Sequence, residues 1–357
     1  MEKCHVSALP RIMDPILCSS WGKTVPMSHI WQSFQKPIFI LAPMEDVTDT
    51  VFRRIVAKTG APDIFFTEFV NVGGLVTRGR HAASRRFVHT EGEQPLIAQI
   101  WGEQPETFRT IARELASGEF GRFVGIDLNM GCPERKVVKR GSCAGLIGRP
   151  DHAIEIIRAT KEGAGDLPVS VKTRCGINDW VTEEWAATLL AQDLAALTIH
   201  GRIAREKSTF PARWDEIAKV VALRDKLGKT TPIIGNGDVS SYQDGLDKVA
   251  QYGVDGVMVG RGIFRNLWFF DPAIDPAMIT LEERVALLAE HIRWWKESWG
   301  DDKNFEALKK FYKAYFFNVP NMGELQRELM LLHTPDETLA RLALVPTERQ
   351  PDMALAR

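Results

Sequence analysis

Eight short apolar runs alternate with amphipathic segments between Pro37 and Phe270, and this alternation constrains the fold more than any other feature of the chain. Each run has the length of a buried strand, and the segments between the runs carry helical periodicity. Strands that alternate with helices form parallel sheets, and eight such units close into a barrel. The runs predicted to be strands are residues 38–42, 64–67, 96–100, 125–128, 169–172, 196–199, 232–234 and 256–259.

Helix start signals stand between several of these runs. They predict helices that begin after Asp49, at Pro105, at Pro150 and after Ser241. After Phe270 the strand-like runs cease, and residues 280–299, 304–317, 322–332 and 337–342 have helical patterns. The predicted fold class is therefore α/β: a poorly ordered tail at residues 1–35, a (β/α)8 TIM barrel at 36–272 and a small all-α helical bundle at 273–357.

Composition sets limits on partners and location. The chain has 45 Lys and Arg against 46 Asp and Glu, so its net charge of -1 does not indicate a nucleic-acid partner, and any phosphate contact must come from local basic patches. The five cysteines lack C-x-x-C spacing, which argues against a disulfide framework or a zinc site. No apolar run reaches the roughly 20 residues that span a bilayer. We expect a cytoplasmic, monomeric protein with no bound metal and no membrane anchor.

Polar and turn-forming residues end the predicted strands. The carboxyl ends of parallel barrel strands converge on one face, which holds the active site in barrels of this kind. The residues at these positions are Pro43, Met44, Glu68, Gln99, Asn129, Lys172, His200, Asn236, Gly260 and Arg261. Placed together, they predict a ligand site at this face.

Glycine turns follow the last two strands. Gly237 and Asp238 lie after the seventh strand, and Gly260 and Arg261 after the eighth. Glycines leave backbone N–H groups free to face an anion, and a basic side chain adds positive charge, which together are typical of the phosphate site of these barrels. The sequence predicts a phosphate-bearing ligand, and sugar phosphates and nucleotide cofactors remain alternatives.

Lys172, His200 and Gln99 favour a flavin among these ligands. A cation at the end of the fifth strand can stabilise the negative charge of a reduced isoalloxazine, and an amide can hydrogen-bond to its pyrimidine edge. The competing interpretation is a Schiff-base aldolase in which Lys172 is the nucleophile.

Cys132 follows the fourth strand in the segment Asn129-Met130-Gly131-Cys132-Pro133. Pro133 restricts the backbone and so the direction of the thiol. A thiol can donate a proton, which suits a reduction that adds hydride to one carbon and H⁺ to its neighbour. We therefore predict a catalytic Cys132, although a cysteine after a strand is more often a small buried apolar residue.

Basic residues follow this segment closely. Lys136, Lys139 and Arg140 lie on the next loop, and Arg174, Arg202 and Arg205 follow the fifth and sixth strands. They can form a track for an RNA backbone, although the loop can equally be a solvated one. Lysines also gather on one side of the predicted helix at 304–317, where a solvated face and a second RNA contact are alternatives; they are Lys303, Lys309, Lys310 and Lys313.

The order and spacing of these motifs resemble the tRNA-dihydrouridine synthases. The matching segments are Ala42-Pro43-Met44, Asn129 to Pro133, Lys172-Thr173-Arg174, His200-Gly201-Arg202, Gly235 to Asp238 and Gly260-Arg261-Gly262. The resemblance implies an FMN prosthetic group, reduction by NADPH, and a helical domain that helps to bind tRNA.

It also assigns roles to residues. The implied FMN contacts are Pro43, Met44, Glu45, Gln99, Lys172, His200, Asn236, Gly237, Asp238, Gly260 and Arg261. Cys132 is the implied proton donor to C5 of uracil while the flavin delivers hydride to C6, and Asn129 lies beside the base. The target uridine must then be turned out of its stack. Glu45, where the family has a small residue, and Cys143, after the catalytic loop, depart from the family pattern.

Two other functions stay open at this point. One is an FMN-dependent barrel that reduces a free small molecule, such as a dihydropyrimidine or an enone. The other is an RNA-binding protein or chaperone that no longer catalyses, against which the presence of Cys132, Lys172 and His200 argues.

Overall fold

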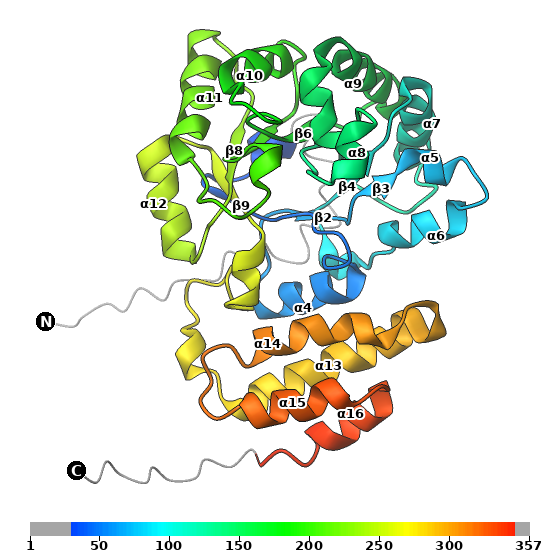
Figure 1. The fold of residues 1–357 in the computed structure, drawn as a ribbon, viewed down its shortest axis with the longest axis vertical. Helices are drawn as coiled ribbons and strands as arrows, with labels where there is room; N and C mark the ends of the chain where they lie inside the picture. Colours follow the sequence, from blue (N-terminus) through cyan, green and yellow to red (C-terminus); the bar gives the residue numbers. More distant parts are fainter. Residues whose placement is uncertain (1–29, 347–357) are drawn as a thin grey trace, which may run out of the picture.

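A ring of eight parallel strands forms the centre of the computed structural model, which describes residues 30–346 (Figure 1). The strands are β1 (Ile38–Leu41), β2 (Phe65–Phe66), β4 (Leu96–Trp101), β5 (Gly125–Met130), β6 (Val169–Arg174), β7 (Leu197–His200), β8 (Ile233–Asn236) and β9 (Gly256–Val259). They pair in the order β1-β9-β8-β7-β6-β5-β4-β2, and a parallel bridge between Ile40 and Ile64 completes the ring. The predicted barrel and its eight strands are confirmed. A short additional strand, β3 (Val70–Asn71), pairs with β4.

The barrel interior is filled by alternate strand residues, as the pleat of a strand requires. They form one buried cluster that includes Ile38, Ile40, Phe66 and Met258. The helix α3 (Ile30–Ser33) adds Ile30 and Trp31 to this cluster, and both are buried. Of the tail predicted at residues 1–35, residues 30–33 form this helix and residues 1–29 lie outside the described part of the chain, so the poor order of the tail stays a prediction.

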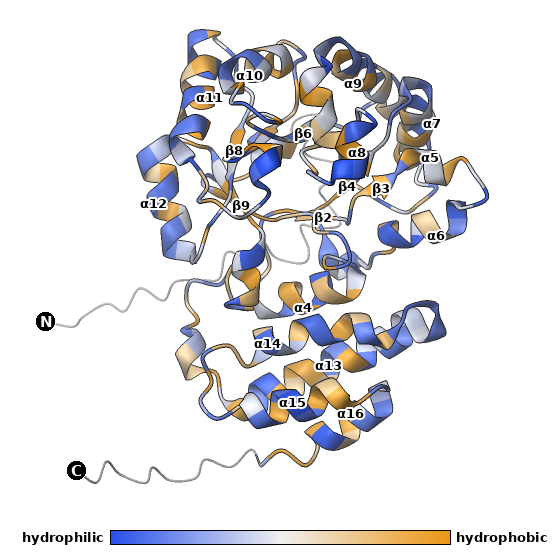
Figure 2. Cartoon of the chain, in the orientation of Figure 1, coloured by the Kyte–Doolittle hydropathy of each residue, from blue (hydrophilic) through white to orange (hydrophobic). Residues whose placement is uncertain are grey.

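Helices cover the outside of the barrel. The four that start signals predicted are α4 (Thr50–Gly60), α7 (Pro105–Ala116), α9 (Pro150–Ala164) and α12 (Tyr242–Tyr252). Asp49 and Ser241 cap α4 and α12 through their side chains. Two further helices, α10 (Thr182–Leu190) and α11 (Trp214–Lys226), complete the layer. Hydrophobic and hydrophilic residues alternate along these helices, as expected for helices with one buried face (Figure 2).

Short helices interrupt the loops at the carboxyl ends of the strands. They are α5 (Val72–Leu75), α6 (Arg80–Ser84), α8 (Arg135–Lys139) and the 3-10 turn η6 (Arg261–Phe264). α8 begins three residues after Cys132, so the predicted basic loop is partly helical.

The segment after residue 272 is helical, as predicted. It contains α13 (Leu281–Trp299), the 3-10 helix η9 (Phe305–Phe311), α14 (Tyr312–Tyr315), α15 (Gly323–Leu331) and α16 (Pro335–Leu342). The prediction of one α-helix over 304–317 is wrong. Phe305, Leu308 and Phe311 are all buried, and their spacing of three residues places them on one face of a 3-10 helix.

Phe311 joins this helical segment to the barrel. Its ring lies 4.8 Å from that of Phe52 in α4, 6.0 Å from that of Phe264 in η6 and 5.1 Å from that of His291 in α13. The buried residues of the helical segment belong to the same apolar cluster as the outer layer of the barrel. The two parts therefore share a core, and the boundary at residues 272 and 273 stays a prediction.

Within residues 30–346, no helix is long and apolar enough to cross a membrane. The same part of the chain has no group of three or more His, Cys, Asp or Glu side chains placed to hold a metal ion.

Candidate active site

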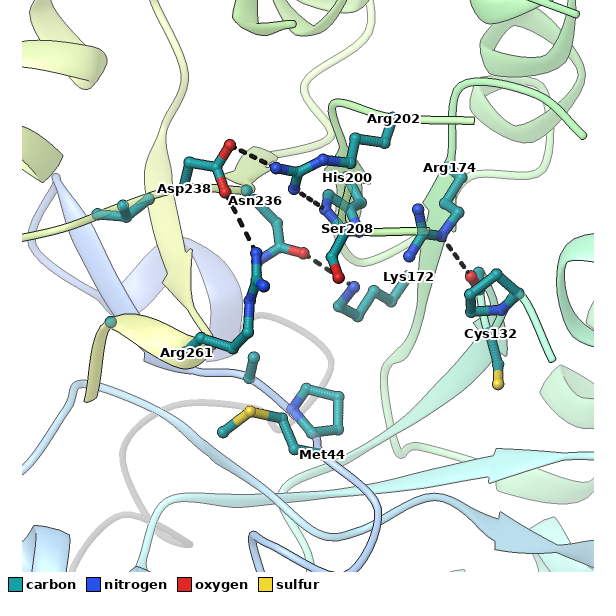
Figure 3. A pocket seen from close by; sticks show the side chains of 18 of the residues that line it. Met44, Cys132, Lys172, Arg174, His200, Arg202, Ser208, Asn236, Asp238 and Arg261 are labelled. Atoms are coloured by element: carbon teal, nitrogen blue, oxygen red, sulfur yellow. Dashed lines mark hydrogen bonds and ion pairs between the residues drawn. The ribbon is translucent and has the colours of Figure 1, made fainter. Parts of the chain in front are cut away.

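A cavity of about 600 Å³ opens at the carboxyl ends of the strands (Figure 3). This volume is in the range of ligand pockets. Most of the site residues predicted from the sequence line it, namely Pro43, Met44, Gln99, Asn129, Cys132, Lys172, Arg174, His200, Arg202, Asn236, Gly237, Asp238, Gly260 and Arg261. The convergence follows from the barrel, because these residues end different strands or follow them directly.

The lining of the cavity is strongly positive. Its charged side chains are those of Lys172, Arg174, Arg202, Arg261, Arg265 and a single carboxylate, Asp238. An anionic ligand is favoured in such a setting, since low-dielectric walls strengthen its attraction to the cations.

Lys172 reaches into the cavity from β6. Its ammonium donates a hydrogen bond to the side-chain oxygen of Asn236 at 3.1 Å, and the Asn236 amide donates to the backbone oxygen of Met258 at 2.7 Å. Burial lowers the pKa of Lys172 to about 8, with the nearby Arg174 acting in the same direction. The ammonium form still predominates at neutral pH, so Lys172 presents a fixed positive charge to the cavity.

His200 is neutral at the end of β7. Burial, together with the charges of Arg174 and Lys172, holds its pKa well below the usual range of an imidazole. The Arg202 guanidinium lies 3.0 Å from Nε2 of His200. Because a guanidinium only donates hydrogen bonds, Nε2 is the acceptor, and the ring proton of the neutral imidazole resides on Nδ1.

Asn129 holds the loop that carries Cys132. Its side-chain oxygen accepts hydrogen bonds from the backbone N–H of Gly131 at 3.1 Å and of Cys132 at 2.9 Å. Its amide donates to Gln99 Oε1 at 3.1 Å, and Arg174 Nε donates to the Gly131 carbonyl at 2.8 Å. The loop is thus fixed from two strands.

The Cys132 thiol is partly exposed and close to Cys143, which is buried. A hydrogen bond with the Cys143 side chain lowers the pKa of Cys132 to about 7, helped by the backbone N–H of Glu134 and by Arg174 and opposed by burial. Cys143 adopts a φ of 49°, a conformation that residues other than glycine adopt rarely. The second thiol therefore tunes the acidity of the first.

The turn after β8 requires glycine. Gly237 has a φ of 123°, and a Cβ there would lie 2.7 Å from that of Ala212 and 3.1 Å from His200 Cδ2. Asp238, at a φ of 49°, binds Arg202 and the backbone N–H of Ala212 through its carboxylate. The side chain of Arg261 is 63% exposed, and its nearest contact with Asp238 is a long one of 3.5 Å between Nη2 and Oδ1. Its guanidinium therefore keeps N–H donors for a ligand.

Several predicted residues lie outside the cavity or differ from expectation. The Glu45 carboxylate accepts two hydrogen bonds from Arg86, and Glu45 is not among the residues that line the cavity, so its contact with a flavin stays a prediction. Lys136, Lys139, Arg140 and Arg205 are exposed on the surface. Arg174 and Arg202 are buried, and they therefore line the cavity rather than extend a basic track over the surface.

The sequence predictions missed five lining residues: Phe69, Ser208, Val239, Ser240 and Arg265. Phe69 and Val239 directly follow Glu68 and Asp238, so their position one residue beyond the predicted strand ends was a usable signal. Arg265 comes four residues after Arg261 and caps the carboxyl end of η6. Nothing in the local sequence marks Ser208.

The sequence model of the family described as "Dihydrouridine synthase (Dus)" matches residues 40–350. The chain belongs to the dihydrouridine synthase family. The match confirms the resemblance to dihydrouridine synthases that the sequence motifs indicated, and with it the prediction of an oxidoreductase.

Curated relatives agree with this family. A "Probable tRNA-dihydrouridine synthase" of Staphylococcus aureus (strain MRSA252) is 43% identical over 329 residues, which is 91% of this chain and 97% of the relative. A "Probable tRNA-dihydrouridine synthase 2" of Bacillus subtilis (strain 168) is 41% identical over 319 residues, or 88% and 95% of the two chains. A solved structure of DHODH from Eimeria tenella has a TM-score of 0.45 and 13% identity, covering 63% of this dihydrouridine synthase and 76% of that chain.

Proposed function

We propose that this dihydrouridine synthase reduces uridines in tRNA to 5,6-dihydrouridine, with FMN as prosthetic group and NADPH as electron donor. The observation that carries the proposal is that the Cys132 thiol lines the same cavity as Lys172, His200 and the glycine turn at Gly237. The names of the relatives support tRNA as the substrate.

The residues present fit FMN. The Gly237 turn and the exposed guanidinium of Arg261 offer N–H donors for a phosphate. The buried ammonium of Lys172 suits the negative charge of a reduced isoalloxazine. The positive charges of the lining therefore suit both the phosphate and the reduced isoalloxazine of this cofactor.

FMN, when bound and reduced by NADPH, would supply the hydride for C6 of uracil. Cys132 supplies the proton for C5, because its thiol is partly exposed and its loop is held by Asn129. Asn129 acts mainly by orienting that loop, and its position in the cavity lining supports a second role in contacting the base.

The RNA approaches across the surface beside Cys132. Lys136, Lys139 and Arg140 are exposed on and after α8, and Arg205 is exposed beyond β7. Such cations bind phosphates without reading sequence, and the target uridine has to leave its stack to enter the cavity. The monomeric state and the cytoplasmic location stay predictions.

The test is to purify the protein and follow its flavin and its product. We expect a yellow protein that releases FMN on denaturation, is bleached by NADPH and forms dihydrouridine in tRNA from cells that lack the enzyme. A protein that takes up no FMN would contradict the proposal. Reduction of free uracil or an enone as efficient as that of tRNA would favour a small-molecule reductase.

A further inference from the structure

The four lysines of the helical segment do not share one solvated face, since they differ in burial and in partners, and contact with RNA stays a prediction for those that are exposed. Lys309 is buried, and its ammonium donates to the Met330 carbonyl at 2.8 Å and pairs with Glu306. Lys303 and Lys310 instead reach across to the loop between β1 and α4. Only Lys313 of the four is exposed without a hydrogen bond or ion pair among the contacts found in residues 30–346.

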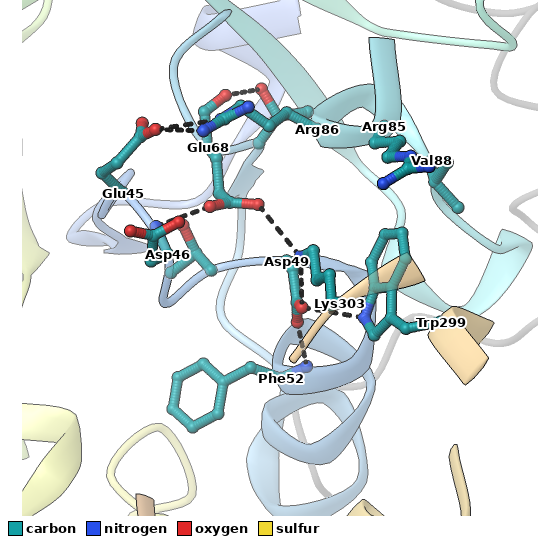
Figure 4. Close-up of polar contacts among 12 residues, drawn as sticks. Glu45, Asp46, Asp49, Phe52, Glu68, Arg85, Arg86, Val88, Trp299 and Lys303 are labelled. Carbon is teal, nitrogen blue, oxygen red and sulfur yellow. Dashed lines mark hydrogen bonds and ion pairs between the residues drawn. The ribbon is translucent and has the colours of Figure 1, made fainter. Parts of the chain in front are cut away.

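Asp49 is the first anchor point on that loop (Figure 4). One of its carboxylate oxygens caps α4 by accepting from the backbone N–H of Phe52 at 3.0 Å. The other accepts from Trp299 Nε1 and from Lys303 Nζ, both at 3.0 Å. The Lys303 ammonium also lies 3.9 Å from the ring centre of Trp299. The start of α4 is thereby bound to the end of α13 and to Lys303, two residues before η9.

Asp46 is the second anchor point. Its φ of 57° is unfavourable for a residue with a side chain, so the surrounding contacts must hold it there. Its backbone N–H donates to Glu68 Oε1 at 2.6 Å, and its carbonyl accepts from the Lys310 ammonium. Glu68 is buried, and its other oxygen lies 4.0 Å from Lys303. Both lysines therefore act on the same short loop.

The loop connects these anchors directly to the cavity. The Met44 carbonyl accepts from the backbone N–H of Thr48 at 3.0 Å, and the Thr48 hydroxyl accepts from the Met44 N–H at 3.0 Å. Pro43 and Met44 line the cavity. Residues 43–49 thus form a compact turn, and we expect a shift at Asp46 or Asp49 to displace Met44.

We propose that Lys303 and Lys310 are positioning residues through which the helical segment holds the 43–49 loop in the shape that binds the flavin. This inference rests on the proposed FMN site. It gives the helical segment a second task besides any contact with RNA, and it implies that the barrel without this segment binds FMN weakly. Deletion of the segment would then reduce turnover even with a substrate that needs no RNA contact.

The experiment measures FMN release from purified holoenzyme on dilution, followed by the fluorescence of free flavin. We expect Lys303→Met to raise the FMN dissociation constant about tenfold and Lys310→Met somewhat less, because such coupling contacts contribute on this scale. Lys303→Arg should recover most of the affinity, since a guanidinium can still pair with Asp49. Lys313→Met is the matched control, with an affinity equal to that of the unmodified protein.

Two further measurements separate positioning from general destabilisation. Trp299→Phe removes one hydrogen bond to Asp49 while it keeps an aromatic ring beside Lys303, and it should also weaken FMN binding. Hydrogen exchange of the backbone N–H groups of residues 44–48 should accelerate in Lys303→Met under conditions where urea unfolding shows the protein to be fully folded.

Unchanged FMN affinity and unchanged exchange in Lys303→Met and Trp299→Phe would overturn this inference while the unmodified protein still binds FMN. An affinity loss that only follows the fraction of unfolded protein would overturn it as well. If the unmodified protein binds no FMN, the proposed function fails instead.

Discussion

The side-chain oxygen of Asn129 accepts a hydrogen bond from the backbone N–H of Cys132 at 2.9 Å. The same oxygen accepts from Gly131, so one carboxamide closes the turn that presents the thiol to the cavity. Because Gln99 in turn accepts from the Asn129 amide, the position of the thiol depends on residues of two neighbouring strands.

Asn129→Ala tests this dependence. Removal of the oxygen leaves the N–H groups of Gly131 and Cys132 without their acceptor, and the thiol loses its fixed position. We expect dihydrouridine formation to fall about ten- to hundredfold while FMN content is retained. Gln243→Ala, which removes an exposed amide from α12, is the control and should leave the rate unchanged. A fully active Asn129→Ala enzyme would contradict the assigned role.

The rate of dihydrouridine formation should fall at alkaline pH. A proton donor must be protonated, and the pKa of Cys132 is lowered to about 7, so activity should decrease about tenfold per pH unit well above that value. Cys143→Ala removes the hydrogen bond that contributes most to this lowering. Its pH profile should therefore descend at a higher pH. If Cys143→Ala does not change the pH at which activity falls, Cys143 does not lower the pKa of Cys132.

Gly237→Ala should abolish flavin binding without unfolding the protein. The added methyl group would meet Ala212 and His200, and the φ of 123° disfavours any side chain. Gly118→Ala is a matched control, since its φ of 82° is also positive but no atom lies within 4 Å of the added carbon. We expect Gly118→Ala to lose about 1 kcal/mol of stability and to keep its FMN. Equal FMN content in the two variants would refute the Gly237 assignment.

Acid should lower the stability of the protein by protonating His291, which packs against Phe311 where the helical segment meets the barrel. Burial lowers the pKa of this histidine from 6.5 to about 4, so the unfolded chain binds the proton more readily than the folded one. The stability that neutral His291 contributes is complete above pH 6.5 and is lost as the pH falls toward 4, by up to about 3 kcal/mol.

The measurement is the free energy of unfolding in urea at several pH values between 7.5 and 4. His291→Leu should start from a lower stability, because Tyr315 loses its hydrogen-bond partner, but should decline less steeply with acid. Parallel pH curves for the two proteins would contradict the assignment to His291.

The barrel and most of the cavity could be predicted from the sequence because they depend on local patterns. The apolar runs mark strands, and the geometry of a parallel barrel then brings Lys172, His200 and Asn236 to one face. The residues that differ from prediction have partners far along the chain. Arg202 is buried because it pairs with Asp238, and Glu45, which is not among the residues that line the cavity, pairs with Arg86.

The contacts of Lys303 and Lys310 could not be predicted from the sequence because their partners also lie far along the chain. Their charge pattern is that of a solvated helix face, and only the packing of Phe311 against α4 brings them to Asp49 and Asp46. Helix periodicity also failed here, since a three-residue spacing of apolar side chains fits a 3-10 helix as well as an α-helix.

The most direct test of the account compares the unmodified enzyme with Cys132→Ala in three measurements on one preparation: FMN content, the rate of flavin reduction by NADPH, and the rate of dihydrouridine formation in tRNA. We predict that the first two are retained and that the third falls about hundredfold or more, because the proton for C5 loses its donor. Dihydrouridine formation by Cys132→Ala at the unmodified rate would contradict the account.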